Sequence, residues 1–230
     1  MLAGDTPVTR IKFMLTDTAM MQKISTSLQE RYPLLRRSSL ARKANRILLR
    51  TSRPRTFKDY NKVFCVGWLR TGTSSFGRSM RRLGFKHCGW DPDVFHDWYE
   101  KGKIEKVIRY ARHFESFDDL PWNHIDIFEK LDAAYPNSKY VLLERDSDEW
   151  FTSFNKHRIG VGMKSVLDER EEYIREYERR NRFIKDYFDG ARSDRLLVMN
   201  VIGGDGYEKL CPFLDLPIPN DPFPHRNKSK

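Results

Sequence analysis

The segment from Val63 to Gly84 places an apolar run, a loop of small residues and a helical pattern in direct succession. The run Val63–Val66 contains no charged residue and predicts a strand that is buried on both faces, as in parallel sheets. It ends at Gly67 in a loop rich in Gly, Thr and Ser, after which apolar residues recur at helical spacing. In such an arrangement backbone N–H groups and the positive end of the helix dipole converge on one point. The segment therefore predicts a binding site for a phosphate-like anion.

The loop lacks the lysine of an ATP-binding P-loop. That motif has the pattern G-x-x-x-x-G-K-[ST], in which the lysine reaches the β- and γ-phosphates. Gly67 and Gly72 keep the glycine spacing, but Thr73 occupies the lysine position and the cation lies earlier, at Arg70. A short Gly/Thr/Ser loop can also cap an ordinary helix, so this loop alone leaves the ligand open.

The loop resembles the 5′-phosphosulfate-binding loop of sulfotransferases that use 3′-phosphoadenosine 5′-phosphosulfate (PAPS). That loop is commonly Lys-x-Gly-Thr-Thr, and this chain has Arg70-Thr71-Gly72-Thr73-Ser74. The resemblance implies that backbone N–H groups from Thr71 to Ser75 hold the 5′-phosphate. It also implies that Arg70, in place of the usual lysine, stabilises the bridging oxygen as the sulfuryl group leaves. Arginine stays protonated and donates to oxyanions, although its geometry differs from that of lysine.

A second resemblance to this family follows a strand predicted at Lys139–Glu144. Arg145 comes directly after the strand, and Ser153 lies eight residues further on. Sulfotransferases hold the 3′-phosphate of PAPS with an arginine and a serine at this spacing, so the resemblance implies that role for Arg145 and Ser153. The chemistry is suitable, because arginine offers a fixed fork of donors and serine adds a hydroxyl. The alternative is a surface Arg145–Asp146 pair with Ser153 on a solvated helix face.

The resemblance also indicates a proton acceptor before an amphipathic helix that bears Ile125, Phe128, Leu131 and Ala134. Cytosolic sulfotransferases have a catalytic histidine two residues before a proline that opens this helix, and Asp119 holds that place before Pro121. Family members that act on sugars and other acceptors often use a carboxylate there, which implies that Asp119 is the base. Asp119 could instead cap the helix, with the proline at its first position. The nearby competitors for the role of base are His113, Glu115 and Asp118.

The C-terminal part extends the resemblance over most of the chain. Residues 206–214 and 222–227 resemble the ending of one sulfotransferase branch, Gly-(Trp/Tyr)-Glu-x-Leu-Cys-x-Phe-Leu followed by Phe-Pro-His-x-Asn. One departure concerns the adenine of PAPS. Many cytosolic members stack a tryptophan on it, whereas this chain has Ser75 at that position, so Trp68 or Trp150 could take over the contact.

Strands that alternate with helices predict an α/β fold: a three-layer sandwich with a central parallel sheet and right-handed crossovers. A further strand is predicted at Leu196–Met199, and helices are predicted at Asp97–Arg112 and Ser165–Gly190. The second of these helices is rich in Glu and Arg, which we place on a solvated outer face. Between them, Phe154–Met163 is predicted to be a mobile loop that could shape an acceptor site.

Basic charge is concentrated near the N-terminus. Arg31–Lys58 contains ten Lys and Arg and no Asp or Glu, which equals the formal net charge of +10 of the whole 230-residue chain. A basic amphipathic helix of this kind could lie on an anionic membrane or hold an acidic polymer. We favour packing of its apolar stripe on the domain, with the arginines in water. No nucleic-acid-binding module accompanies it, so nucleic acid is not an expected partner. We divide the chain into a basic helical arm at 1–60 and a sulfotransferase domain at 61–230.

Three widely spaced cysteines, Cys65, Cys88 and Cys211, predict buried thiols in a reducing compartment. His87-Cys88 has no second pair at ligand spacing, so we expect no metal. The sequence shows no long apolar run and no signal peptide, which favours a cytoplasmic enzyme, with peripheral membrane contact through the arm as a further possibility.

The resemblance implies a single in-line transfer of a sulfuryl group from PAPS to a hydroxyl or amine of a carbohydrate, lipid or small-molecule acceptor. Two alternatives stay open. One is a P-loop nucleotide kinase or other NTPase, against which the lysine missing after Gly72 counts. The other is a non-catalytic protein that keeps the nucleotide pocket and recruits partners through the basic arm.

Overall fold

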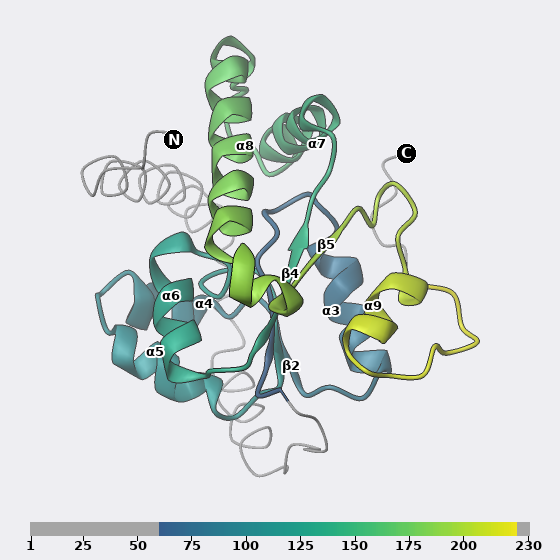
Figure 1. Cartoon of the computed structure of the whole chain (residues 1–230). Coiled ribbons are helices and arrows are strands. Elements are labelled where there is room, and N and C mark those ends of the chain that lie inside the picture. The colour runs from purple at the N-terminus through teal and green to yellow at the C-terminus, as the bar shows by residue number, and fades with distance from the viewer. Residues whose placement is uncertain (1–59, 225–230) are drawn as a thin grey trace.

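The computed structural model describes residues 60–224, so the predicted arm lies outside the described residues apart from Tyr60 (Figure 1). Within them, five strands form one parallel sheet in the order β2–β3–β1–β4–β5. The strands are β1 (Val63–Cys65), β2 (His87–Cys88), β3 (Ser116–Phe117), β4 (Lys139–Leu143) and β5 (Leu196–Met199). This parallel α/β architecture confirms the predicted fold class.

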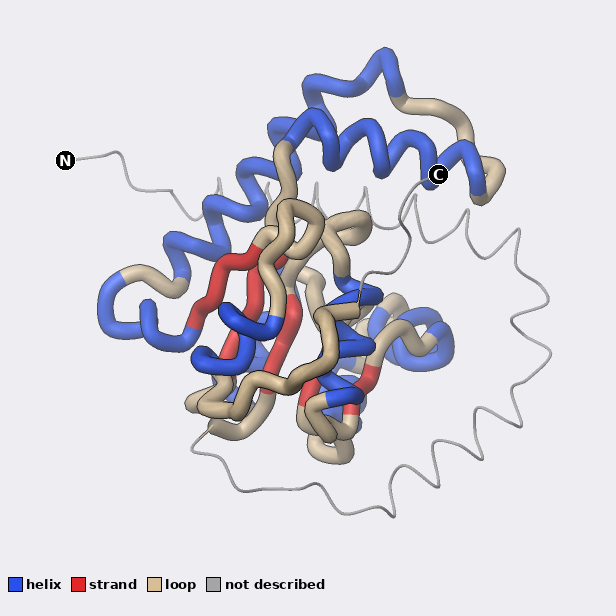
Figure 2. Tube along the Cα trace, turned by 90° about the vertical axis from the view of Figure 1, so that its right-hand side faces the viewer, coloured by secondary structure: helices blue, strands red, loops and turns tan. Residues whose placement is uncertain are grey.

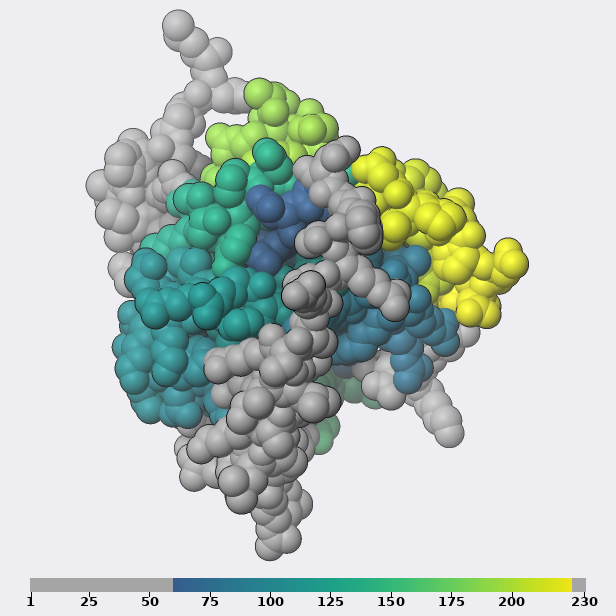
Figure 3. Space-filling model, turned by 90° about the horizontal axis from the view of Figure 1, so that it is seen from below, coloured from purple at the N-terminus to yellow at the C-terminus, as the bar shows by residue number. Residues whose placement is uncertain are grey.

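Helices cover both faces of the sheet. In Figure 1, α3 and α9 lie on one side and α4, α5 and α6 on the other, while α7 and α8 extend beyond one edge. Figure 2 shows the same projection of α7 and α8 from a second direction, and Figure 3 shows the α5–α6 side (teal) opposite the α3–α9 side (blue and yellow). The α-helices are α3 (Thr73–Arg82), α4 (Pro92–Val94), α5 (Ile104–Ala111), α6 (Ile125–Ala134), α7 (Ser147–Gly160), α8 (Arg170–Tyr187) and α9 (Tyr207–Phe213). Short helices of other types are η2 (Phe95–Tyr99), η3 (Leu167–Glu169) and η4 (Gly190–Arg195).

Strand β1 is buried on both faces, as its uninterrupted apolar run predicts. Successive side chains of a strand point to opposite faces, so Val63 and Cys65 join the core under α3 and α9, whereas Phe64 and Val66 join the core under α4 to α6 and α8. All four side chains are at most 1% exposed. The central strand therefore holds the loop that follows it on a rigid base.

The prediction of a mobile loop at Phe154–Met163 was wrong, because α7 continues to Gly160. Phe154 is buried and stacks on Trp150, which keeps this part of the chain helical and packed. The glycines lie only at the end of the helix, where Gly162 adopts a φ of 77°. This stretch therefore does not form the loop that was predicted to shape an acceptor site.

The other two helix predictions were correct in place but too long. The helix predicted at Asp97–Arg112 is divided, since η2 ends at Tyr99, Gly102 turns the chain with a φ of 68°, and α5 begins at Ile104. The helix predicted at Ser165–Gly190 is α8, which is shorter at both ends.

Candidate active site

Three loops meet at the carboxyl edge of the sheet, because the strands that precede them are neighbours. β1 lies between β3 and β4, so the segments that begin after Cys65, Phe117 and Leu143 leave the same edge side by side. Chain connections run toward β2 and β3 on one side of β1 and toward β4 and β5 on the other. Ligands of open α/β sheets bind at such a switch point.

The loop after β1 adopts backbone conformations that suit an anion site. Arg70 and Gly72 have positive φ values of 69° and 108°. Gly72 precedes α3 without a side-chain cap, and the first helical bonds run to its carbonyl from Ser75 N (2.9 Å) and Phe76 N (3.0 Å). The N–H groups of Thr73 and Ser74 precede these bonds and lie at the positive end of the helix.

The remaining loop residues of the predicted site serve partly to hold the loop. The Thr71 hydroxyl is buried and donates to the carbonyl of Trp68 at 2.5 Å, so it stabilises the turn. A Cβ atom at Gly72 would lie 3.2 Å from Val201 Cβ, which shows how closely the loop approaches the β5–α9 connection. The side chains of Thr73 and Ser75 are buried, whereas Ser74 is exposed.

A hydrogen bond joins the two predicted binding motifs. Arg70 Nε donates to Ser153 Oγ at 3.1 Å, although 83 residues separate them. Burial lowers the pKa of Arg70, and the positive charge of Arg145 lowers it further. Arg145 Nε lies 3.2 Å from Glu149 Oε2. An anion bound near two guanidinium groups that repel each other would relieve the repulsion, so this arrangement is a candidate anion site.

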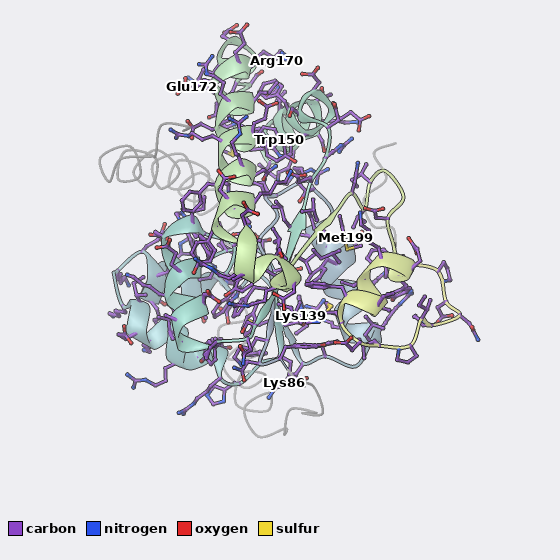
Figure 4. All side chains as sticks on the ribbon, viewed as in Figure 1. Lys86, Lys139, Trp150, Arg170, Glu172 and Met199 are labelled. Atoms are coloured by element: carbon purple, nitrogen blue, oxygen red, sulfur yellow. The ribbon has the colours of Figure 1, made fainter. Side chains whose placement is uncertain are left out.

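An aromatic frame fixes α7 against the loop after β1. Trp150 Nε1 donates to the carbonyl of Leu69 at 3.1 Å, and its ring stacks on Tyr177 at 4.2 Å between centroids (Trp150 is labelled in Figure 4). The Tyr177 hydroxyl accepts from Arg145 N (2.9 Å) and donates to Arg145 O (3.1 Å). Arg145 is thereby held at the end of β4.

The suggestion that Trp68 or Trp150 stacks on adenine was wrong. The exposed fraction is 1% for Trp68 and 0% for Trp150, and Trp150 lies between the stacked rings of Tyr177 and Phe154. Neither indole has a face left for a base. Both tryptophans instead stabilise the walls of the site.

Asp119 lies in the loop after β3 with a φ of 62°. It does not cap α6, which begins at Ile125 after His124, so Pro121 does not open that helix either. Its Oδ1 accepts from Leu120 N at 2.9 Å. Burial and, second, the charge of Asp118 raise the pKa of Asp119 to about 6.

The competitors for the role of base lie in different surroundings. Glu115 and His113 precede β3, at the opposite edge of the sheet, and Glu115 Oε2 accepts from Lys86 N at 2.8 Å. Asp118 follows β3 but is buried, with its Oδ1 3.3 Å from His87 Nε2. At the carboxyl edge, Asp119 is half-buried as a residue, whereas Asp118 is buried.

Sequence reasoning missed Arg180, a buried cation of α8. Its Nη1 donates to Val66 O at 2.8 Å and its Nη2 donates to the carbonyl of Asn123, whose side-chain Nδ2 donates to Gly67 O at 3.1 Å. Arg180 thus connects α8 with the ends of β1 and of the β3–α6 loop. Its position in the apolar stripe, three residues after Tyr177, was the available signal.

A cavity of about 740 Å³ borders the site at Arg145. The ends of β4 and β5 and one face of α8 line it, and two ion pairs lie on its wall: Lys185–Glu144 at 2.8 Å and Lys209–Asp205 at 2.9 Å. Met199, labelled in Figure 4, marks the end of β5 at this cavity. The volume lies in the usual range of ligand pockets.

Cys65, Cys88 and Cys211 are buried thiols, as predicted. Among residues 60–224, no group of three or more His, Cys, Asp or Glu side chains is placed to hold a metal ion. In the same part of the chain, no helix combines the length and apolar character needed to cross a bilayer.

Comparison with known proteins agrees with this geometry. The chain matches the family described as the sulfotransferase domain over residues 62–168 and 158–230. It belongs to this family, which confirms the resemblance seen in the motifs. A curated protein of Aspergillus versicolor, Ava biosynthesis cluster protein M, is 26% identical, and the alignment covers 71% of this chain and 80% of that protein.

Proposed function

We propose that the protein transfers a sulfuryl group from PAPS to a hydroxyl or amine of an acceptor. The acceptor oxygen or nitrogen attacks sulfur and forms a new S–O or S–N bond, while the bond from sulfur to the bridging oxygen of the phosphosulfate breaks. The acceptor proton passes to Asp119. The products are the sulfated acceptor and 3′,5′-ADP, and the step needs no metal ion.

The contact between Arg70 and Ser153 is the observation that carries this proposal. PAPS is anionic at two places, the 5′-phosphosulfate and the 3′-phosphate. The hydrogen bond from Arg70 to Ser153 brings together the two motifs that would bind these two groups. The N–H groups at the start of α3 hold the 5′-phosphate and Arg70 neutralises charge on the leaving oxygen. Arg145 and Ser153 hold the 3′-phosphate.

Asp119 is suited to accept the proton. With a pKa raised to about 6, its carboxylate is mostly ionised at neutral pH and yet is a stronger base than an exposed aspartate.

The nucleoside has space beside these groups. The 740 Å³ cavity at Arg145 can take the ribose side of the nucleotide. We place the adenine against Ile202, whose side chain is 43% exposed and reaches within 3.9 Å of a Cβ built at Gly72.

The acceptor belongs to the carbohydrates, lipids or small molecules. A relative named for a biosynthesis cluster favours a small molecule among these. We place the reaction in the cytoplasm, where buried free thiols such as Cys65 remain reduced.

A thermal-shift comparison of 3′,5′-ADP with ATP and Mg²⁺ tests the donor. A ligand at 100 times its Kd adds ~2.7 kcal/mol of stability, which for a domain of this size raises Tm by roughly 5–10 °C. We expect this shift with 3′,5′-ADP and little with ATP–Mg²⁺. A shift with ATP–Mg²⁺ alone would make the protein a P-loop kinase or NTPase. Nucleotide binding without transfer to any acceptor of a broad panel would make it a non-catalytic binding protein.

A further inference from the structure

His157 lies on the side of α7 that faces the loop after β1, which bears Arg70. Glu149, Ser153 and His157 are spaced four residues apart, so they share one face of the helix. Glu149 contacts Arg145 and Ser153 contacts Arg70. The half-exposed His157 is the next residue of this row, on the side of Ser153 away from Arg145.

The positive charge of Arg70 affects the pKa of His157. Burial lowers the pKa of His157, and the positive charge of Arg70 lowers it further, so both effects favour the neutral imidazole. If His157 took a proton from the acceptor, it would become a second cation beside Arg70, which is unfavourable. A neutral imidazole that donates its N–H to an anionic oxygen needs no change of charge. The surroundings therefore favour a donor over a base.

We propose that the His157 side chain donates a hydrogen bond to a non-bridging oxygen of the sulfuryl group of PAPS. This inference rests on the proposed function, which places Arg70 at the bridging oxygen. The sulfuryl oxygens are the next atoms beyond that oxygen, and His157 is the residue that follows Ser153 on the same face of α7, one turn further on. His157 thus recognises the part of PAPS that 3′,5′-ADP lacks.

The test compares the Kd values of PAPS and 3′,5′-ADP by calorimetry in the full chain, which requires no acceptor. His157→Leu removes the donor, whereas His157→Gln and His157→Asn keep an amide N–H at slightly different reach. We expect His157→Leu to raise the Kd of PAPS roughly tenfold and the Kd of 3′,5′-ADP less than twofold. The reason is that a hydrogen bond to a charged group is lost only in the complex with PAPS. At least one amide variant should restore PAPS binding to within about threefold of wild type. The control Lys156→Met changes an exposed side chain on another face of α7 and should leave the ratio of the two Kd values unchanged.

The other outcomes overturn the inference in distinguishable ways. If His157→Leu raised the Kd values of both ligands equally, the histidine would contact the part of the nucleotide that they share. If neither Kd changed, the histidine would not contact the ligand. If the Gln and Asn variants bound PAPS as weakly as the Leu variant, His157 would not act as a hydrogen-bond donor. If the wild-type protein bound neither ligand, the proposed function itself would fail. If the wild type bound both ligands and His157→Leu left both Kd values unchanged, only the inference about His157 would be wrong.

Discussion

Arg70 and Arg145 carry the same charge but lie at different places in the site, so their removal should have different effects. Arg70 is assigned to the leaving oxygen, where negative charge develops only during transfer. We expect Arg70→Ala to lower kcat by about 10²-fold or more and to leave the Kd of 3′,5′-ADP within a few-fold, since such stabilisation is worth ~3 kcal/mol. Arg145→Ala should instead raise that Kd by roughly 10-fold or more.

Release of 3′,5′-ADP under single-turnover conditions and calorimetric titration measure these two effects. Arg70→Lys introduces the residue that sulfotransferases commonly have at this position. It is the matched control and should have a higher kcat than Arg70→Ala. The reverse pattern, with Arg70 needed for binding and Arg145 for turnover, would show that the two roles are exchanged.

Asp119 should lower stability at neutral pH as a consequence of its surroundings. Its folded-state pKa of about 6 exceeds its ordinary value, so the folded protein binds a proton that the unfolded chain has lost. Stability therefore falls as pH rises from about 4 to about 6 and stays reduced above. Asp119→Asn removes this penalty and keeps an oxygen for Leu120 N.

We expect Asp119→Asn to stabilise the protein at pH 8 by ~1 kcal/mol, a value discounted for partial exposure, and to raise Tm by roughly 2–4 °C. At pH 4 the gain should vanish, while transfer activity should be lost at every pH. Thermal melts of both proteins at pH 4 and pH 8 measure this difference. A gain in stability of equal size at both pH values would mean that burial does not raise the pKa of Asp119.

At the scale of the element, two glycines in helices should respond oppositely to alanine. A Cβ on Gly77 of α3 would lie 2.7 Å from His87 Nε2 and would also meet the Asp118 carboxylate. On Gly160 at the end of α7 it meets nothing within 4 Å. Helix propensity favours alanine at both positions by ~1 kcal/mol, so only packing separates them.

We expect Gly77→Ala to destabilise the protein by ~1–3 kcal/mol, as overpacked core substitutions do, and Gly160→Ala to stabilise it by ~0.5–1 kcal/mol. Urea denaturation measures both. Destabilisation by Gly160→Ala would show that this glycine has a role that its open surroundings do not reveal, and a neutral Gly77→Ala would show that β2 and β3 can move away from α3.

The sequence patterns located the long elements and failed where length or packing decides. β1, β4 and β5 follow from apolar runs, whereas β2 and β3 have two residues each, too short for any periodicity. The end of α7 was mistaken for a loop because Gly160 and Gly162 outweighed the buried Phe154. Of the candidate site, the loop after β1, Arg145 and Ser153 were recognisable as motifs. The buried bonds of Arg180 and the position of His157 depend on how α7 and α8 pack against β1.

At the scale of the whole molecule, strand order explains why motifs far apart in the chain meet at one edge of the sheet. The sequence predicted parallel strands but not their order. Because β1 lies between β3 and β4, the loop bearing Arg70, the loop bearing Asp119 and the turn at Arg145 leave one edge as neighbours. The three segments therefore need no domain closure to meet.

The charge of the whole molecule gives a last prediction, on the segment Arg31–Lys58. This segment carries ten basic residues, and the rest of the chain is balanced at 32 basic and 32 acidic residues. Basic residues near an anionic membrane contribute ~1 kcal/mol each. Packing of the apolar stripe of this segment on the domain, which we favour, leaves its arginines in water, where they can still attract an anionic surface. We therefore expect the full chain to co-sediment with phosphatidylserine vesicles at low salt and to dissociate at about 0.5 M salt, where the Debye length is only a few Å.

Replacing Arg36, Arg37, Arg42 and Arg46 by Gln should weaken vesicle binding at least tenfold. The matched control replaces four exposed basic residues of the described body by Gln: Lys101, Arg109, Arg175 and Arg192. These are spread over different elements, so their loss lowers the net charge equally without removing a concentrated patch. Equal effects of the two sets would show that net charge alone attracts the protein. Vesicle binding that survives the arm substitutions would exclude this segment as the membrane contact and leave packing on the domain as its role.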